Sequence, residues 1–273
     1  MLDGIDIITI FVALNFKNVA DLLIDLGNSN CKAAFHYRGE LVQVYKDSGE
    51  NLNLFLDFLV KEWKNFFKGS SIDIIDIIVF SNVRDEMPLF EDRLREICNK
   101  LVVVKDDMEL PVEMRYGFVP IGLGADRLAG ALAVTMMFPN DNCIKFDFGT
   151  ALTVDFIDKG AYYAGGNISL GFKTRLRALN HFTKRLPLIE PDVDCPDIGI
   201  NTSGAITAGV ELGLIFEVDG YMNKYPDRKI IFTGGDSLYF AGKLKRKIFV
   251  IKNLVLLGLG LIADYYAADV NKN

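Results

Sequence analysis

The sequence has 273 residues, half of them hydrophobic, which is enough to bury a core in one large domain or in two of moderate size, and we expect two. Its formal net charge of −6 and its pI of about 5.1 argue against a nucleic-acid scaffold, because phosphate backbones are bound through excess lysine and arginine. The four cysteines lie far apart without a C-x-x-C pair, which argues against a zinc ribbon or a secreted disulfide framework and favours the cytoplasm. With two histidines, a Ser-His-Asp triad or a histidine-rich metal centre is a poor hypothesis.

Both ends of the chain are apolar, but neither pattern is typical of a membrane segment. In residues 1–20, Asp3 and Asp6 stand where a signal peptide carries positive charge, so we interpret this stretch as an N-terminal extension, either an extra strand or a loosely ordered segment. The C-terminal run "LVLLGLGLIA" is about half as long as a bilayer-spanning helix and predicts a core helix.

The first half of the chain predicts a mixed α/β domain over residues 21–138. An apolar strand ends in "LLIDLGNSNCK", and alternation through "KAAFHYRGELVQVY" predicts a meander with a turn at Arg38-Gly39. A helix follows, a buried strand at "IDIIDIIVF", a helix over Pro88 to Asn99 and a strand at "LVVV". The apolar residues of the first helix recur at helical spacing: Leu52, Phe55, Leu56, Leu59, Trp63 and Phe66.

The second half, residues 139–273, repeats this order with strands at "CIKFDFG", "ALTVDFID" and "AYYAGGNIS" and a helix from Phe172 to Lys184. A D-x-G turn opens each half, and a glycine turn follows 14 positions after Asp25 and 13 positions after Asp147. We therefore expect a duplication with its boundary near Phe138-Pro139-Asn140 and a ligand cleft between the two domains.

The paired turns suit phosphate binding. Gly27 lets the backbone turn tightly, and Asn28 and Ser29 offer donors to phosphate oxygens. Asp25 cannot bind phosphate directly, but it can hold Mg²⁺ that lies between carboxylate and phosphate. Lys32 on the second strand is either a phosphate ligand or a solvated surface residue. The alternative for each aspartate is a simple turn cap.

These turns, D-x-G-N-[ST] and D-x-G-T-A, resemble the two phosphate motifs of the ASKHA superfamily of actin, hexokinase and acetate kinase, which implies two ribonuclease H-like domains with mixed sheets flanked by helices. The segment "VPIGLGADRLAGALAV" is similar to the P-x-x-x-G-x-D-R segment of the type III pantothenate kinases, the Bvg accessory factor-like family. Further similar segments follow in the family's order, and together they cover about residues 21 to 262: "YYAGGNISLGFKTRLRAL", "IGINTSGAITAGV", "FTGGDSLYF" and "LVLLGLGLI".

The resemblance implies a homodimeric kinase that phosphorylates the primary hydroxyl of pantothenate with ATP, the first step of coenzyme A synthesis, without nucleic-acid or membrane partners. Asp126 would accept the hydroxyl proton, a role that suits phosphoryl transfer through a loose transition state. Arg127, Gly124 and Tyr116 would bind pantothenate. Thr202 would reach that site from the neighbouring subunit, so the active site would lie at the subunit interface.

For ATP, the resemblance implies binding by both turns and by the "TGGD" segment, with Mg²⁺ at Asp25 through phosphate or water and a monovalent cation, K⁺ or NH₄⁺, at Asp147. The implied ATP-binding residues are Asp25, Gly27, Asn28, Ser29, Lys32, Gly149, Thr150, Gly234 and Gly235.

Several interpretations stay open. Asp126 with Arg127 is also what a helix N-terminus favours, and "GINTSGA" also suits a helix N-cap at Thr202 or Ser203. Leu170 stands where the family often has proline, and none of the basic residues of "GFKTRLRAL" is assigned to a ligand. The alternative functions are another small-molecule kinase of the superfamily and a transcription accessory protein of the same family.

Overall fold

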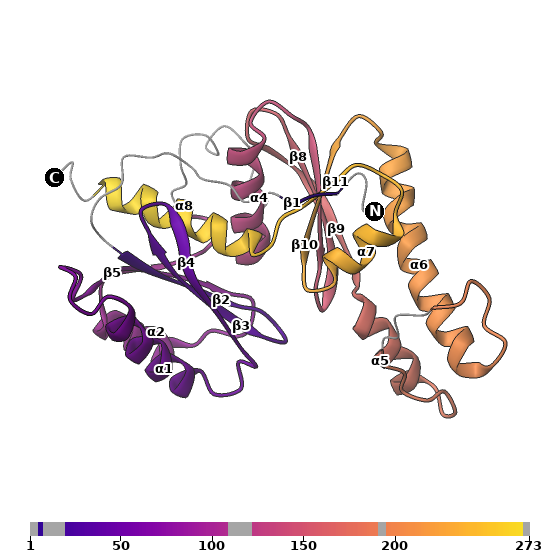
Figure 1. The fold of residues 1–273 in the computed structure, drawn as a ribbon, viewed down its shortest axis with the longest axis horizontal. Coiled ribbons are helices and arrows are strands. Elements are labelled where there is room, and N and C mark those ends of the chain that lie inside the picture. Colours follow the sequence, from indigo (N-terminus) through magenta and orange to yellow (C-terminus); the bar gives the residue numbers. More distant parts are fainter. Residues whose placement is uncertain (1–4, 8–19, 109–121, 191–194, 270–273) are drawn as a thin grey trace. The chain divides into compact units, whose positions relative to one another are not determined.

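The structure, a computed structural model, describes residues 5–7, 20–108, 122–190 and 195–269 of the chain. It divides into two compact units, each with its own β-sheet (Figure 1). The N-terminal unit takes its described residues from 10–139, 160–162 and 253–273, and the C-terminal unit takes them from 1–9, 140–159 and 163–252. The predicted α/β class is confirmed.

The N-terminal unit contains a five-stranded mixed sheet in the order β4-β3-β2-β5-β6. β2, β3 and β4 pair antiparallel, whereas β2, β5 and β6 pair parallel. Its elements are β2 (Ala20–Leu26), β3 (Cys31–Tyr37), β4 (Glu40–Asp47), α1 (Leu52–Phe66), β5 (Ile75–Asn82), α2 (Pro88–Glu96), β6 (Cys98–Val103), α4 (Ala125–Met137) and α8 (Leu254–Asp269).

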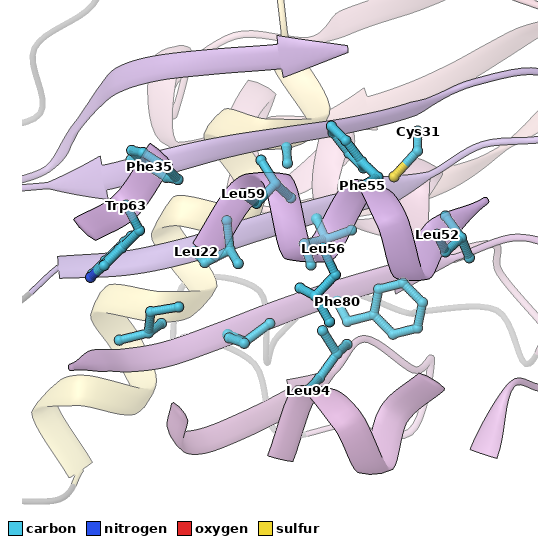
Figure 2. Close-up of a cluster of buried hydrophobic side chains, with 14 of the residues drawn as sticks. Leu22, Cys31, Phe35, Leu52, Phe55, Leu56, Leu59, Trp63, Phe80 and Leu94 are labelled. Atoms are coloured by element: carbon cyan, nitrogen blue, oxygen red, sulfur yellow. The ribbon is translucent and has the colours of Figure 1, made fainter. Parts of the chain in front are cut away.

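Helix α1 covers one face of this sheet and builds the core there (Figure 2). It begins at the N-cap Asn51, whose side chain accepts a hydrogen bond from the Leu54 N–H at 3.1 Å. Five of its six predicted core residues are buried, but Phe66 is 47% exposed and Phe67 is buried instead. Phe66 is the last residue of the helix. Beyond it, helical spacing no longer determines which side chain points into the core, and Phe67 takes that place.

Helix α8 packs on the opposite face of the same sheet, against β2 and β5, with α4 beside it (Figure 1). A side chain at Gly258 would place its Cβ 1.9 Å from the Ala129 carbonyl oxygen, so α8 can approach the α4 backbone this closely only with glycine at that position. The C-terminal apolar run is thus a core helix, as expected. No helix in the described part of the chain is long and apolar enough to cross a bilayer.

The C-terminal unit contains a six-stranded sheet in the order β1-β11-β10-β7-β8-β9. Strand β7 pairs antiparallel with β8 and parallel with β10, and the parallel pairing continues through β11 to β1. Its core lies between the sheet and helices α5, α6 and α7. The elements are β1 (Ile5–Ile7), β7 (Cys143–Phe148), β8 (Ala151–Asp158), β9 (Tyr162–Leu170), α5 (Phe172–Phe182), α6 (Thr202–Lys224), β10 (Lys229–Gly234), α7 (Ser237–Lys243) and β11 (Ile248–Val250).

The register of the strands supports the predicted duplication. In the N-terminal unit Asp25 lies opposite Lys32 on one neighbouring strand and Ser81 on the other. In the C-terminal unit Asp147 lies opposite Thr153 and Thr233 in the same way. The two aspartates therefore occupy equivalent positions, each beside a hydroxyl residue on the adjacent parallel strand.

The structure also differs from the sequence expectations. Helix α8 belongs to the N-terminal unit, although it lies within the range 139–273 that we expected to form the C-terminal domain. Part of the extension, Ile5–Ile7, forms strand β1 beside β11, as one of the two interpretations predicts. Helix α2 ends at Glu96 instead of Asn99, because the chain from Cys98 onward pairs with β5.

Candidate active site

The first D-x-G turn is a tight hairpin between β2 and β3. The Gly27 N–H donates to the Asn30 carbonyl at 2.9 Å, and the side chains of Asn28 and Ser29 are exposed at the tip. Lys32 follows on β3, directly across from Asp25. The structure therefore brings together all five residues that the sequence analysis assigns to this turn.

Two residues that the sequence analysis missed hold this hairpin in place. The buried Ser81 donates from Oγ to Asp25 Oδ1 at 3.2 Å. Arg84 donates from Nε to the Gly27 carbonyl at 2.9 Å and from a terminal guanidinium nitrogen to the Gly49 carbonyl at 2.8 Å. Both follow the buried run "IDIIDIIVF", so a prediction that β5 pairs parallel with β2 would have placed them beside the hairpin.

The second D-x-G turn joins β7 and β8 in the C-terminal unit. The Gly149 N–H donates to the Ala151 carbonyl at 3.1 Å, and Gly149 and Thr150 are both exposed. The Thr150 carbonyl accepts from the Gly171 N–H at 3.0 Å and from Thr174 Oγ1 at 2.6 Å. These two hydrogen bonds from the start of α5 hold the turn in place. Leu170, which stands where the family often has proline, does not prevent them.

The "TGGD" segment follows β10 and lies against the same turn. Gly234 has φ +92°, and a side chain there would place its Cβ 2.5 Å from Asp147 Oδ1 and 2.6 Å from the Phe148 backbone nitrogen. A Cβ at Gly235 would meet nothing within 4 Å. The Asp236 N–H donates to the Phe148 carbonyl at 3.3 Å. The D-x-G turn and the "TGGD" segment therefore bring five predicted residues close together: Asp147, Gly149, Thr150, Gly234 and Gly235.

The predicted proton acceptor Asp126 lies in the first turn of α4, whose N-cap is Gly124. Its Oδ1 accepts a hydrogen bond from the Arg127 backbone N–H at 2.8 Å, and both residues are half-buried. The partial positive charge of a helix N-terminus favours a carboxylate at this place. Tyr116, predicted to bind substrate, lies outside the described residues.

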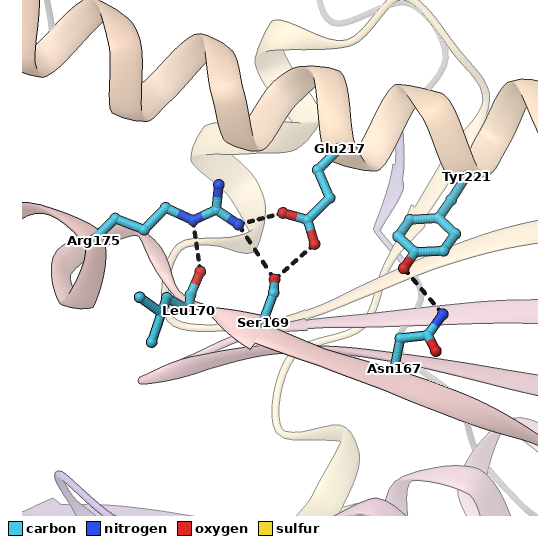
Figure 3. A network of polar contacts seen from close by, with 6 residues as sticks. All are labelled: Asn167, Ser169, Leu170, Arg175, Glu217 and Tyr221. Atoms are coloured by element: carbon cyan, nitrogen blue, oxygen red, sulfur yellow. Dashed lines mark hydrogen bonds and ion pairs between the residues drawn. The ribbon is translucent and has the colours of Figure 1, made fainter. Parts of the chain in front are cut away.

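Arg175 has a structural role rather than an open binding role (Figure 3). It donates from Nε to the Leu170 carbonyl at 2.7 Å, and its guanidinium pairs with Glu217 and contacts Ser169 Oγ. Glu217 is on α6, so this network ties α5 and the end of β9 to α6. Lys173 is more exposed, with Nζ 3.9 Å from Asp236 Oδ1 beside the "TGGD" segment.

Thr202 is the first residue of α6, but it is not the N-cap. Asn201 is the N-cap, because its Oδ1 accepts from the Gly204 N–H at 2.8 Å. The interpretation of Thr202 or Ser203 as the cap is therefore wrong. Thr202 is exposed and lines a groove of about 820 Å³ between α5 and α6, together with Leu179, Phe182 and Ile206 among others.

Comparison with known proteins agrees with the geometry. The type III pantothenate kinase family matches residues 21–224. The type III pantothenate kinase of Phocaeicola vulgatus is 36% identical over 249 residues, which cover 90% of this chain and 98% of that protein. That of Porphyromonas gingivalis strain W83 is 34% identical over 254 residues, with the same coverage.

Solved structures with lower identity share the fold. A Campylobacter jejuni protein described as a Baf family transcriptional activator superposes with a TM-score of 0.57 at 21% identity, covering 90% of this chain and 99% of that one. The activator of 2-hydroxyisocaproyl-CoA dehydratase from Clostridium difficile, solved with bound ADPNP, has a TM-score of 0.55 at 11% identity, covering 93% of this chain and 97% of that one. With the family match over most of its length and relatives above 30% identity, the chain belongs to the type III pantothenate kinase family.

Proposed function

We propose that this chain transfers the γ-phosphoryl group of ATP to the primary hydroxyl of pantothenate, giving 4′-phosphopantothenate in the first step of coenzyme A synthesis. Its family membership supports this activity. The observation that carries the proposal at the level of the site is the repeated acidic hairpin, with Asp25 and Asp147 at equivalent register positions beside exposed glycine turns. A repeated phosphate turn is what a nucleotide-dependent kinase of this fold requires.

Asp126 is the proposed acceptor for the hydroxyl proton. Phosphoryl transfer through a loose transition state needs a positioned acceptor for a proton that moves late, more than it needs a strong base. Its hydrogen bond to the Arg127 N–H fixes the carboxylate at the start of α4. Arg127 is proposed to pair with the carboxylate of pantothenate through parallel hydrogen bonds, and Gly124, Tyr116 and Thr202 complete the proposed pantothenate site.

Asp25 and Asp147 are the proposed cation-binding residues of the two hairpins. Asp25 is half-buried next to the exposed donors of Asn28 and Ser29, and Mg²⁺ favours one or two carboxylates plus phosphate oxygens. We therefore assign Mg²⁺, through phosphate or water, to Asp25, and K⁺ or NH₄⁺ to Asp147. Bound Mg²⁺ would supply charge neutralisation on the phosphates. Lys32, Gly149 and Thr150 are the further proposed phosphate contacts, and Gly234 and Gly235 are proposed to lie against adenosine.

Purified protein should release ADP only when pantothenate, ATP, Mg²⁺ and a monovalent cation are all present. The assay compares K⁺, NH₄⁺ and Na⁺ at equal ionic strength, so that an effect of the specific cation is separated from screening. Glucose and acetate in place of pantothenate are the controls for another kinase of the superfamily. Equal turnover with either control substrate, or none with pantothenate, would refute the proposed acceptor.

We also propose that the chain acts as a homodimer. The supporting observation is the groove between α5 and α6, which holds Thr202 and the large apolar side chain of Phe182, 82% exposed. Exposed apolar side chains around a groove are typical of interaction surfaces. Light scattering after gel filtration should give about twice the chain mass of 30.5 kDa. A monomeric mass for active protein would contradict a site shared between subunits.

The cytoplasm is the proposed compartment. All four cysteines are free thiols. Burial raises the pKa of both the Cys31 and the Cys143 thiols to about 12, so these side chains are unreactive. Free thiols suit a reducing environment. A role as a transcription accessory protein is not favoured by the family match.

A further inference from the structure

Three ionisable side chains meet where α8 packs on the N-terminal sheet. Asp21 and His36 are direct cross-strand partners on β2 and β3, and both are at least 96% buried. His36 Nδ1 lies 3.1 Å from Asp21 Oδ2, and His36 Nε2 lies 3.8 Å from Asp264 Oδ2 on α8. Asp21 Oδ1 also accepts from the Ile77 N–H at 3.2 Å. We call these three residues the α8 cluster.

The α8 cluster combines two carboxyl groups with one imidazole. Burial is the main reason that the pKa of Asp264 is raised to about 6; His36 lowers this pKa and the Asp21 carboxylate raises it. Carboxylate and imidazole groups are common metal ligands, and here they stand together where Asp21 and His36 are buried and Asp264 is partly exposed.

The distance between His36 Nε2 and Asp264 suits an ion between them. At 3.8 Å it exceeds the usual range of a hydrogen bond. Two ligands of a tetrahedral zinc ion, each about 2.1 Å from the metal, are about 3.4 Å apart. To bind an ion, His36 Nε2 and Asp264 Oδ2 would thus need to move only about 0.4 Å closer together. A cavity of about 20 Å³, lined by His36 and Asp264, offers space for a water molecule.

Asp21 is placed to orient the histidine. Its carboxylate faces Nδ1, so it favours the tautomer that carries the proton on Nδ1 and leaves the lone pair of Nε2 directed toward Asp264. A carboxylate that accepts from the second nitrogen of a metal-bound histidine is the common arrangement in metal sites. The same three residues are mutually close enough to serve as a ligand set.

We propose that His36 Nε2 and the Asp264 carboxylate bind a divalent transition-metal ion such as Zn²⁺, with Asp21 orienting the histidine and water completing the coordination. The ion would tie the last helix of the chain to the N-terminal sheet. It is separate from the phosphate hairpin, since Asp21 and Asp25 are four residues apart on β2, about 13 Å at ~3.3 Å per residue.

The test is a titration of the full-length, metal-free protein with Zn²⁺ at neutral pH, in competition with a chromophoric chelator and with excess Mg²⁺ to occupy sites that prefer oxygen ligands. We expect one Zn²⁺ per chain and a raised Tm. His36→Gln and Asp264→Asn should each abolish this binding, whereas Asp21→Asn should weaken it about 10- to 100-fold. His181→Gln, at the only other histidine and exposed, is the matched control and should bind as the wild type does.

If the variants fail to fold, the wild type still decides the matter. With two histidines in the chain, NMR during the Zn²⁺ titration should shift the ring signals of one histidine, and the His181→Gln spectrum identifies it as His36. No Zn²⁺ binding, binding that survives both ligand substitutions, or a shift of His181 alone would each overturn the proposal and leave a hydrogen-bonded cluster. Because the measurement does not involve turnover, it is independent of the kinase assay.

Discussion

Asp126→Asn is expected to lower kcat for pantothenate phosphorylation by about 10²- to 10⁴-fold, the usual contribution of a positioned proton acceptor. Asparagine keeps the size of the side chain and an oxygen that can accept from the Arg127 N–H, so the start of α4 should be preserved. The KM for ATP should change little, because the proposed role concerns the acceptor hydroxyl. Steady-state kinetics with varied pantothenate and varied ATP measures both effects.

The matched control for this substitution is Asp73→Asn, which removes an exposed carboxylate in the same unit. Its kcat should equal that of the wild type. Circular dichroism and Tm should be unchanged for both variants, so that a loss of rate is assigned to chemistry. Turnover of Asp126→Asn within a few-fold of wild type would eliminate Asp126 as the proton acceptor.

Gly234→Ala is expected to destabilise the C-terminal unit by about 2–5 kcal/mol, from backbone strain together with overpacking. The residue has φ +92°, and the added methyl group would meet Asp147 Oδ1 and the Phe148 backbone within about 2.6 Å. Such a loss is a large part of the stability of an ordinary domain. Urea unfolding followed by circular dichroism should show a lower midpoint, and the KM for ATP should rise because Asp147 is displaced.

Gly235→Ala is the neighbouring control, because a Cβ at this position meets nothing within 4 Å. Its unfolding midpoint should stay close to that of the wild type, although its proposed place beside adenosine allows a change in KM. Equal midpoints for the two alanine variants would show that Asp147 and Gly234 are not packed together as described.

The duplicated topology could be predicted from the sequence because each half repeats the same local signals in the same order. Strand alternation, helical spacing and glycine turns are local properties, and they placed β2, β3, α1, β7 and β8 well. The partners of α8 could not be predicted in this way. Its apolar run shows that the helix is buried, but a sequence pattern does not say which sheet covers it, and the last helix of the chain packs in the N-terminal unit.

The residues of the site that belong to sequence motifs could be predicted. Asp25, Gly27, Asp147 and Gly234 belong to motifs with a physical reason for each residue type. Arg84 has no such motif, since its role depends on two carbonyl groups, at Gly27 and Gly49, that only the folded chain brings near its guanidinium. The cap at Asn201 instead of Thr202 depends on a backbone angle that composition leaves open.

The position of α8 affects how the protein folds during synthesis and how it tolerates truncation. During synthesis the N-terminal sheet emerges from the ribosome long before the helix that covers one of its faces, so that unit cannot be complete until α8, Leu254–Asp269, has been translated. Fragments divided at Pro139 would leave the surface around His36 and Ala129 without its cover. A nonsense mutation shortly before Leu254 would therefore damage the half of the protein that was translated first.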